Sequence, residues 1–246
     1  MKVSLVCIAK NEDEYIQEWI NYNLKLGFDD IFIYQNDWRC SIEHPNVKKI
    51  EFDGVAKQIP SYRDFVINHH SEYDWAAFYD VDEFLVLKKH NNVKEFISDY
   101  SEHSAIGINW AMFGDNGLTK VDGDYSVLKR FTKRQIIPQR HVKSIVKLNP
   151  NIKMRVHGPM DYWVDTDRNR NSGPYSIRPL DNVAQINHYF GKTIEEFHQK
   201  SSRGKADCTP ISCSPEYSKR TIKDFNYFNG NEIEDMTGCE FLYGKS

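Results

Sequence analysis

The sequence predicts an α/β fold with a mixed central sheet and helices on both of its faces. Residues 3–9 and 30–37 are hydrophobic runs without polar alternation, and a helical pattern with Ile16, Trp19 and Ile20 on one face separates them. Such runs are typical of strands buried on both faces, and a strand, a helix and a second such strand form a βαβ unit with parallel strands. The carboxyl ends of those strands then lie at one edge of the sheet, where open α/β folds bind ligands.

The remaining elements follow from the same patterns. Asn11, three residues before Glu14, predicts a capping box for the first helix, and Gly27 predicts its end. Thr193 with Glu196 predicts a second capping box. The further expected elements are strands at 47–54, 75–87, 104–114, 125–133, 142–149 and 183–190, helices from about Ser61 to residue 70, at 93–101 and at 192–204, and a polar loop at 165–174. The part of the sheet after residue 101 is expected to be more antiparallel.

Length and composition indicate one globular domain. The chain has 246 residues, of which 40% are hydrophobic and 27% charged, and a net charge of −3 gives no reason to expect nucleic acid as a partner. We expect the domain at residues 1–206 and a C-terminal tail at 207–246, irregular or packed on the domain, because periodicity is lost there.

The cysteines and the N-terminal run indicate a reducing compartment. Five cysteines are scattered without a C-x-x-C pair, so we expect no disulfide framework and a cytoplasmic location. The run at 3–9 is too short to span a membrane, and the Lys-Asn-Glu-Asp-Glu after it does not resemble a cleavage site. It is read as the first strand of the fold.

One acidic triplet lies in an unusual place. Of three D-x-D triplets, the one at Asp122 is read as a hairpin turn and the one at Asp165 as part of the polar loop, but Asp80 and Asp82 follow a hydrophobic strand. Residues i and i+2 of a strand point to one side, so two carboxylates there can share Mg²⁺ or Mn²⁺. The alternative is that they end a strand and face water, although Glu83 continues directly into a further apolar run.

Several segments together resemble glycosyltransferase family 92 and its bacterial relatives, which have the GT-A fold. They are "VSLVCIAKNEDEYIQEWINYNLKLGFDDIFIYQND", "FYDVDEFLVL", "INWAMFGDNG", "KSIVKL" with "VHGP", and "INHYFGKTIEEFHQKSSRG", in that order along most of the chain. The resemblance implies transfer of a hexose, typically galactose, from a UDP-sugar to a hydroxyl of a glycan or lipid-linked saccharide, with inversion. It also implies an enzyme that works in the cytoplasm, with the cytoplasmic face of the membrane as a site of peripheral association.

The resemblance implies roles for the acids and two histidines. Asp80 would contact the nucleotide ribose or the metal, and Asp82 would bind Mn²⁺ or Mg²⁺ that bridges the diphosphate. His157 and His188 close extended segments within the resembling motifs and are candidate metal ligands; the alternative for each is an ordinary hydrogen-bonded histidine.

The ends of the first two strands are expected to bind the nucleoside. In the family's fold Ala9, Asn11 and Glu12 would lie at the uracil and ribose, with helix capping as the alternative for Asn11. Asn36 and Asp37 end the second strand and line the same pocket or form a turn.

Three basic residues are candidate phosphate contacts. Lys200 and Arg203, in the last turn of the 192–204 helix, close over the diphosphate or complement the helix dipole. Lys143 is the candidate taken from the basic stretch at 129–147, whose lack of interleaved aromatic residues argues against single-stranded nucleic acid.

Inversion requires a base that faces the acceptor hydroxyl. Asp115 is the first candidate because its segment resembles the part of the family that meets donor sugar and acceptor; Asp161 and Glu83 are the alternatives. Trp110 either stacks on a sugar or packs in the core. A D-x-D phosphatase and a sugar-nucleotide pyrophosphorylase fit less well, since Phe84 and the segment "AKNEDE" depart from their patterns, and a non-catalytic nucleotide- or carbohydrate-binding module stays an alternative.

Overall fold

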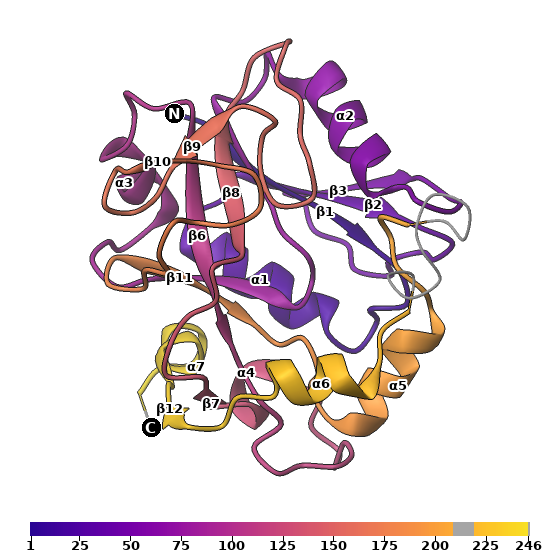
Figure 1. The fold of residues 1–246 in the computed structure, drawn as a ribbon. Helices are drawn as coiled ribbons and strands as arrows, with labels where there is room; N and C mark the ends of the chain where they lie inside the picture. The colour runs from indigo at the N-terminus through magenta and orange to yellow at the C-terminus, as the bar shows by residue number, and fades with distance from the viewer. Residues whose placement is uncertain (209–218, 246) are drawn as a thin grey trace.

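A computed structural model describes residues 1–208 and 219–245 (Figure 1). Its strands are β1 Val3–Ala9, β2 Asp30–Gln35, β3 Val47–Glu51, β4 Trp75–Phe78, β5 Glu83–Leu87, β6 Ala105–Met112, β7 Lys133–Arg134, β8 Val142–Lys147, β9 Tyr162–Val164, β10 Arg170–Ser172, β11 Ala184–His188 and β12 Ile233–Glu234. Its helices are α1 Ile16–Leu26, α2 Gln58–His69, α3 Val93–Ser98, α4 Val127–Arg130, α5 Ile194–Ser202, α6 Ile222–Phe228 and α7 Thr237–Tyr243.

A mixed sheet forms the centre of the molecule. Its strand order among the described residues is β10-β9-β6-β8-β4-β1-β2-β3, while β11 pairs with β5 and β6 to one side of this path. Strands β4, β1, β2 and β3 are parallel to their neighbours in that order, whereas β8 runs antiparallel to both β4 and β6. The predicted parallel first part and more antiparallel second part are confirmed.

Helices cover both faces of the sheet, as predicted. In β1, Leu5 and Cys7 belong to the hydrophobic cluster that contains Trp19 of α1, whereas Val6 and Ile8 belong to the cluster on the other face, with Tyr62 and Phe65 of α2. Figure 1 shows α1 and α2 on opposite sides of the sheet. Burial on both faces therefore explains why β1 shows no alternation of polar and apolar residues.

The structure corrects two predictions about where the first two helices begin. Gly27 ends α1 with φ 102°, as predicted, but Tyr15 precedes the first turn and gives no side-chain cap. Asn11 has φ 53° and lies well before the helix, so its predicted capping role is wrong. Helix α2 begins at Gln58, three residues before the predicted Ser61.

The acidic segment is not one strand. β4 ends at Phe78 and pairs with β1 and β8, whereas β5 begins at Glu83 and pairs with β11. Asp80 and Asp82 lie in the connection between them. The chain thus returns to the interior as a second strand with different partners. The uninterrupted apolar pattern of the sequence did not reveal this change of strand.

One further prediction is wrong. The expected strand at 125–133 is the short helix α4, capped by the Ser126 side chain, followed by β7. Of the two alternatives for the C-terminal tail, its described part shows the packed one: β12 pairs with β7, and α7 packs on α1, with Phe241 against Tyr22 at 5.0 Å between ring centroids. Residues 209–218 of the predicted tail lie outside the described part.

The described cysteines and helices add two facts. Cys7, Cys40 and Cys239 are free thiols, whereas Cys208 is disulfide-bonded, which differs from the expectation that the cysteines form no disulfide framework.

No helix within residues 1–208 and 219–245 is long and apolar enough to cross a bilayer.

Gly107 on β6 leaves space for a buried indole. A Cβ at this position would lie 2.2 Å from a ring carbon of Trp163, which is fully buried. We expect Gly107→Ala to lower the free energy of unfolding by about 1–3 kcal/mol, the usual cost of overpacking, as measured by urea denaturation. Gly158→Ala is the control, because its Cβ would meet its nearest neighbour at 3.4 Å; equal effects of the two substitutions would refute the argument.

Glu196, the third residue of α5, should make stability depend on acid pH. It belongs to the predicted capping box with Thr193, which is confirmed, and it is ion-paired with Arg130 at 2.8 Å. Burial alone would raise the pKa of Glu196, but the hydrogen bonds that its carboxylate accepts outweigh burial and lower the pKa from 4.5 to about 2.

Because the folded-state pKa is depressed, this stabilisation is present above pH 4.5 and is lost as the pH falls toward 2. We expect wild-type protein to lose about 2 kcal/mol more than Glu196→Gln across that interval, measured as the free energy of unfolding. Parallel pH profiles of the two proteins would contradict this expectation.

Candidate active site

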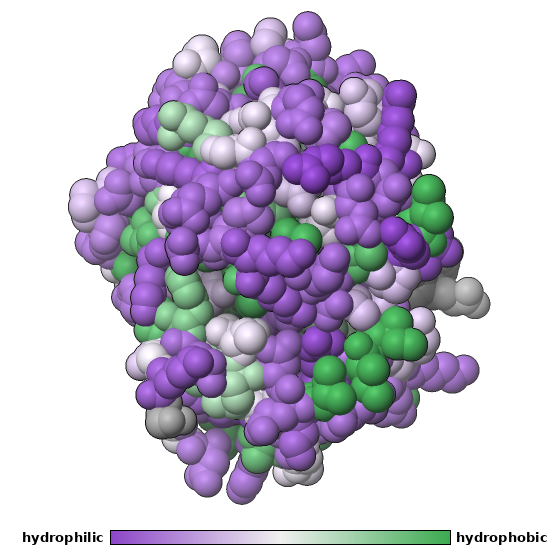
Figure 2. Space-filling view, turned by 90° about the vertical axis from the view of Figure 1, so that its left-hand side faces the viewer, coloured by the Kyte–Doolittle hydropathy of each residue, from purple (hydrophilic) through white to green (hydrophobic). Residues whose placement is uncertain are grey.

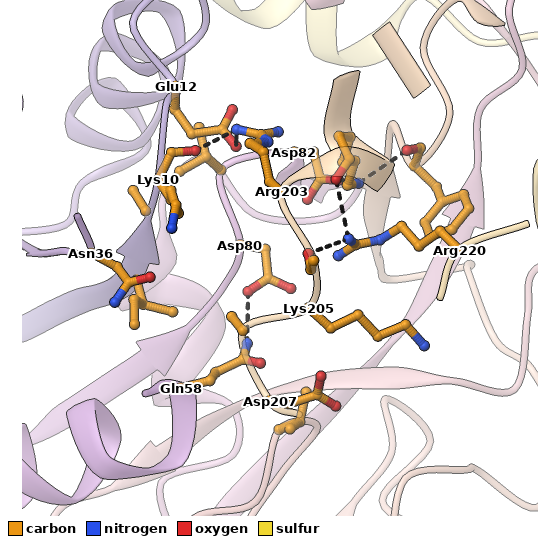
Figure 3. Close-up of a pocket in the computed structure, with 18 of the residues that line it drawn as sticks. Lys10, Glu12, Asn36, Gln58, Asp80, Asp82, Arg203, Lys205, Asp207 and Arg220 are labelled. Atoms are coloured by element: carbon orange, nitrogen blue, oxygen red, sulfur yellow. Dashed lines mark hydrogen bonds and ion pairs between the residues drawn. The ribbon is translucent and has the colours of Figure 1, made fainter. Parts of the chain in front are cut away.

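A cavity of about 400 Å³ opens at the carboxyl ends of the parallel strands. Ala9 at the end of β1 and Asn36 just after β2 line one side, and Asp80 and Asp82 line it from the connection between β4 and β5. Trp110 of β6 lines it from the antiparallel part of the sheet. Figure 3 shows these elements converging on one space, at the edge where open α/β sheets bind ligands.

Asp80 is held from two sides. Gln58, at the start of α2, donates to Asp80 Oδ1 at 3.0 Å, and Lys143 Nζ donates to Oδ2 at 2.9 Å. Lys143 reaches it because β8 pairs with β4. The side chain of Lys143 is buried behind the cavity and does not line it, so Lys143 positions Asp80 and its predicted phosphate contact is wrong.

Glu83 shares the same lysine. Its Oε2 lies 3.4 Å from Lys143 Nζ and accepts a hydrogen bond from the Asp80 backbone N–H at 3.0 Å. Burial raises the pKa of Glu83 well above its usual value, although Lys143 acts in the opposite direction. Glu83 is fully buried, so it cannot serve as the base that faces an acceptor.

Asp82 has different partners from Asp80. Lys200 Nζ donates to Asp82 Oδ2, and His188 Nε2 lies 3.5 Å from the same oxygen. Burial alone would raise the pKa of Asp82, but Lys200 and His188 outweigh burial and lower the pKa well below its usual value. Asp82 is therefore ionised at neutral pH, with a counter-charge of its own.

Asp82 and His188 fit a divalent cation only as a partial site. A carboxylate oxygen and an imidazole nitrogen 3.5 Å apart are suitable ligands for one ion such as Mn²⁺. Within the described residues, however, no group of three histidine, cysteine or acidic side chains could hold a metal. The remaining ligands would be phosphate oxygens and water, which is how Mg²⁺ and Mn²⁺ commonly bind in nucleotide sites.

His157 belongs to an aromatic wall. Its Nδ1 lies 3.1 Å from the Val142 carbonyl oxygen, and its ring lies 5.2 Å from that of Trp110. His141 stacks on the same indole at 4.8 Å, and His188 meets it at 4.4 Å. Burial lowers the pKa of His157 to about 3 and that of His141 to about 4, so both are neutral. The structure places His157 in this wall, away from the Asp82 carboxylate.

Cationic side chains line the cavity from the residue after β1, from the end of α5 and from the segment before α6. Arg203 donates to the Asn11 carbonyl oxygen at 2.7 Å and to Glu12 Oε1 at 2.9 Å. Arg220 donates to the Gly204 carbonyl oxygen at 2.7 Å, as Figure 3 shows. The cations that line the cavity are Lys10, Lys200, Arg203, Lys205 and Arg220. Lys200 and Arg203 thus lie where a diphosphate contact was predicted.

Three further predicted residues, besides Lys143, do not line the cavity. Asn11 contributes only its backbone carbonyl to Arg203. Asp37, with φ 47°, accepts from Lys10 and from the Gly54 N–H, so it forms the turn that was the alternative. Asp115 accepts from the side chains of Asn229 and Asn231 and from the Gly117 N–H, in a loop outside the cavity, and its role as base is wrong.

The prediction also missed residues that line the cavity. Gln58 was missed because α2 was expected to begin at Ser61, and Arg220 because no periodic pattern marked its segment as ordered. Lys10 carried a usable signal, since it directly follows β1. Phe190, which accepts through its carbonyl oxygen from Lys200 at 3.0 Å, also lay within a quoted motif.

The chain is similar to known proteins along most of its length. The model of glycosyltransferase family 92 matches residues 41–214. A family 92 protein of Arabidopsis thaliana is 27% identical over 78% of this chain and 36% of its own, and one of Ricinus communis is 24% identical over 82% and 38%. The chain spans about a third of the length of these curated relatives.

Among solved structures, S. aureus TarS is 17% identical over 60% of this chain and 47% of its own, with a TM-score of 0.35, which carries no argument about function. The family model, by contrast, covers well over half of the chain and includes Asp80, Asp82, His188 and Lys200. The chain belongs to glycosyltransferase family 92.

Proposed function

We propose that the chain is a metal-dependent, inverting glycosyltransferase that moves a hexose from a UDP-sugar to a hydroxyl group. The observation that carries the proposal is an ionised, buried Asp82 beside His188 and Lys200, in a cavity that several further cations line. A cavity that has acidic side chains to bind a metal ion on one side and basic side chains on the other suits a metal-bound diphosphate.

Different residues of the cavity would contact different parts of the UDP-sugar. Asn36, Gln58 and Asp80 supply polar groups at the end of the cavity near β1 and β2, where the nucleoside would lie. Arg203 and Arg220 line the same cavity, and they would stabilise electrostatically the negative charge that develops as UDP departs. A divalent cation on Asp82 and His188 would supply Lewis-acid assistance to that departure.

The aromatic wall would hold the transferred sugar. Trp110 is nearly buried among His141, His157 and His188, and the neutral state of His141 and His157 keeps this side of the cavity free of extra positive charge. An aromatic surface of this kind binds the C–H face of a sugar and excludes water. Galactose is the first candidate because the sequence resembles family 92.

The acceptor and the location are part of the proposal. We propose a glycan or lipid-linked saccharide acceptor and an enzyme that works in the cytoplasm at the membrane surface. A disulfide at Cys208 is more typical of an oxidising compartment, so cell fractionation with an antibody to this chain is the direct check.

The test is release of UDP from a panel of sugar nucleotides. UDP-galactose, UDP-glucose, UDP-N-acetylglucosamine and GDP-mannose are incubated with the protein in Mn²⁺ or in chelator. We expect release from a UDP-hexose in Mn²⁺ alone, and no release from GDP-mannose. If no sugar nucleotide is bound or hydrolysed with Mn²⁺ present, the proposal fails.

A further inference from the structure

We infer that a second cavity, next to the first, binds saccharide units of the acceptor; this inference rests on the proposed function. The second cavity has a volume of about 590 Å³ and is lined by Arg140, Met160, Asp161, Tyr162, Arg170 and Tyr175, among others. It lies on the antiparallel part of the sheet, at β9, β10 and the loops beside them. Nothing in the donor side of the site uses these residues.

The walls of the two cavities adjoin each other, although no described residue lines both. Arg140 lines the second cavity and His141, the next residue, lines the first. The loop after β8 does the same, since His157 lines the first cavity and Asp161 the second. His141 also forms a backbone bridge with Tyr175, and their rings lie 4.6 Å apart. The second cavity therefore begins where the aromatic wall of the first one ends.

A continuous row of side chains connects Asp82 to the second cavity. His188 lies 3.5 Å from Asp82, its ring lies 4.4 Å from Trp110, Trp110 lies 4.8 Å from His141, and His141 lies 4.6 Å from Tyr175. An acceptor along this row would have its reacting hydroxyl next to the donor sugar. Its more distant sugar units would then reach Tyr175.

The size of the first cavity supports a separate acceptor site. Cavities of roughly 300–1,000 Å³ bind ligands of drug size, and the first cavity, at about 400 Å³, lies near the lower end of that range. A saccharide acceptor of more than one unit must extend beyond it. The second cavity is the space into which the adjoining walls lead.

The lining of the second cavity suits a saccharide. Tyr175 is 50% exposed and Tyr162 37% exposed, and such rings pack against the C–H faces of sugars. The guanidinium of Arg170 lies 3.7 Å from the centre of the Tyr162 ring and holds it in place. Arg140 and Asp161 are exposed and offer donors and acceptors to hydroxyl groups. Figure 2 shows a face of the molecule that is mostly hydrophilic, with hydrophobic residues in separate groups.

The first experiment measures binding without turnover. Labelled protein with UDP and Mn²⁺ is applied to an array of immobilised oligosaccharides of hexoses and N-acetylhexosamines. We expect wild-type protein and Tyr175→Phe, which keeps the ring, to bind the same saccharides. Tyr175→Ala and Tyr162→Ala should weaken binding about tenfold. Tyr227→Ala removes a tyrosine that is 63% exposed and lies outside both cavities, and this variant should bind as wild type.

The second experiment uses a bound saccharide as the acceptor in the transfer reaction. Tyr175→Ala should raise KM for that saccharide about tenfold and leave KM for the UDP-sugar and donor hydrolysis without acceptor unchanged. Unchanged saccharide binding in both alanine variants, or a wild type that binds UDP but no saccharide, would overturn the inference. Failure of the proposed function has a different signature, because the protein would then bind no UDP-sugar, whatever the array shows.

Discussion

Asp82→Asn should reduce transfer about a thousandfold. The substitution keeps the size of the side chain but removes the charge that would hold the metal, whose contribution to departure of the leaving group is worth several kcal/mol. It also leaves Lys200 buried beside a neutral amide. The measurement is the initial rate of UDP release with Mn²⁺ and saturating UDP-sugar.

A matched control exists in the same chain. Asp122 is the first acid of another D-x-D triplet, it is exposed, and it lies outside the cavity, so Asp122→Asn should keep wild-type activity. Both variants are compared at a temperature at which their unfolding curves show them folded. If Asp82→Asn retained a tenth or more of the wild-type rate, Asp82 would not bind an essential metal.

Lys143→Met should be the most destabilising single substitution at the site. Lys143 is fully buried and neutralises Asp80 and Glu83, and removal of one partner from a buried ion pair costs about 3–5 kcal/mol. Urea denaturation at pH 7 measures the loss.

Two comparisons isolate the cause. Lys147→Met changes an exposed residue at the end of the same strand and should shift the free energy of unfolding by about 0.5 kcal/mol or less. Adding Glu83→Gln to Lys143→Met removes one of the stranded carboxylates and should restore part of the stability. If the double variant were as unstable as the sum of the two single variants, the charges of Lys143 and Glu83 would not be coupled.

Much of the fold was predictable because local patterns agreed with burial. Strands β1 and β2 are mostly apolar and buried at every position, and helix α1 has one apolar face and ends at Gly27, so the hydrophobic pattern alone predicted them. The pattern failed in the segment from Trp75 to Leu87, where two buried strands follow one another. A hydrophobic run reports burial, and it does not report which neighbour each half of the run pairs with.

The site was predictable where a motif and a strand end coincided. Asp82 and His188 were predicted as metal ligands and lie side by side, but Asp80 and Asp82 do not share one partner. The separate roles of Lys143 and Lys200 depend on which strands and helices meet, which is a tertiary fact. Asp115 was misassigned for the same reason, because two asparagines more than a hundred residues away hold it in a loop.

The position of α6 and α7 determines how this protein can be divided. Family similarity covers residues 41–214, yet Ala9 and Asn36 on one side and Arg220 and Phe228 on the other complete the walls of the cavity. A recombinant fragment cut to the boundaries of the family model would lose β1, α1, β2 and the helix α6 that brings Arg220 and Phe228 into place. The span that the family model matches is therefore shorter than the span that builds the walls of the cavity.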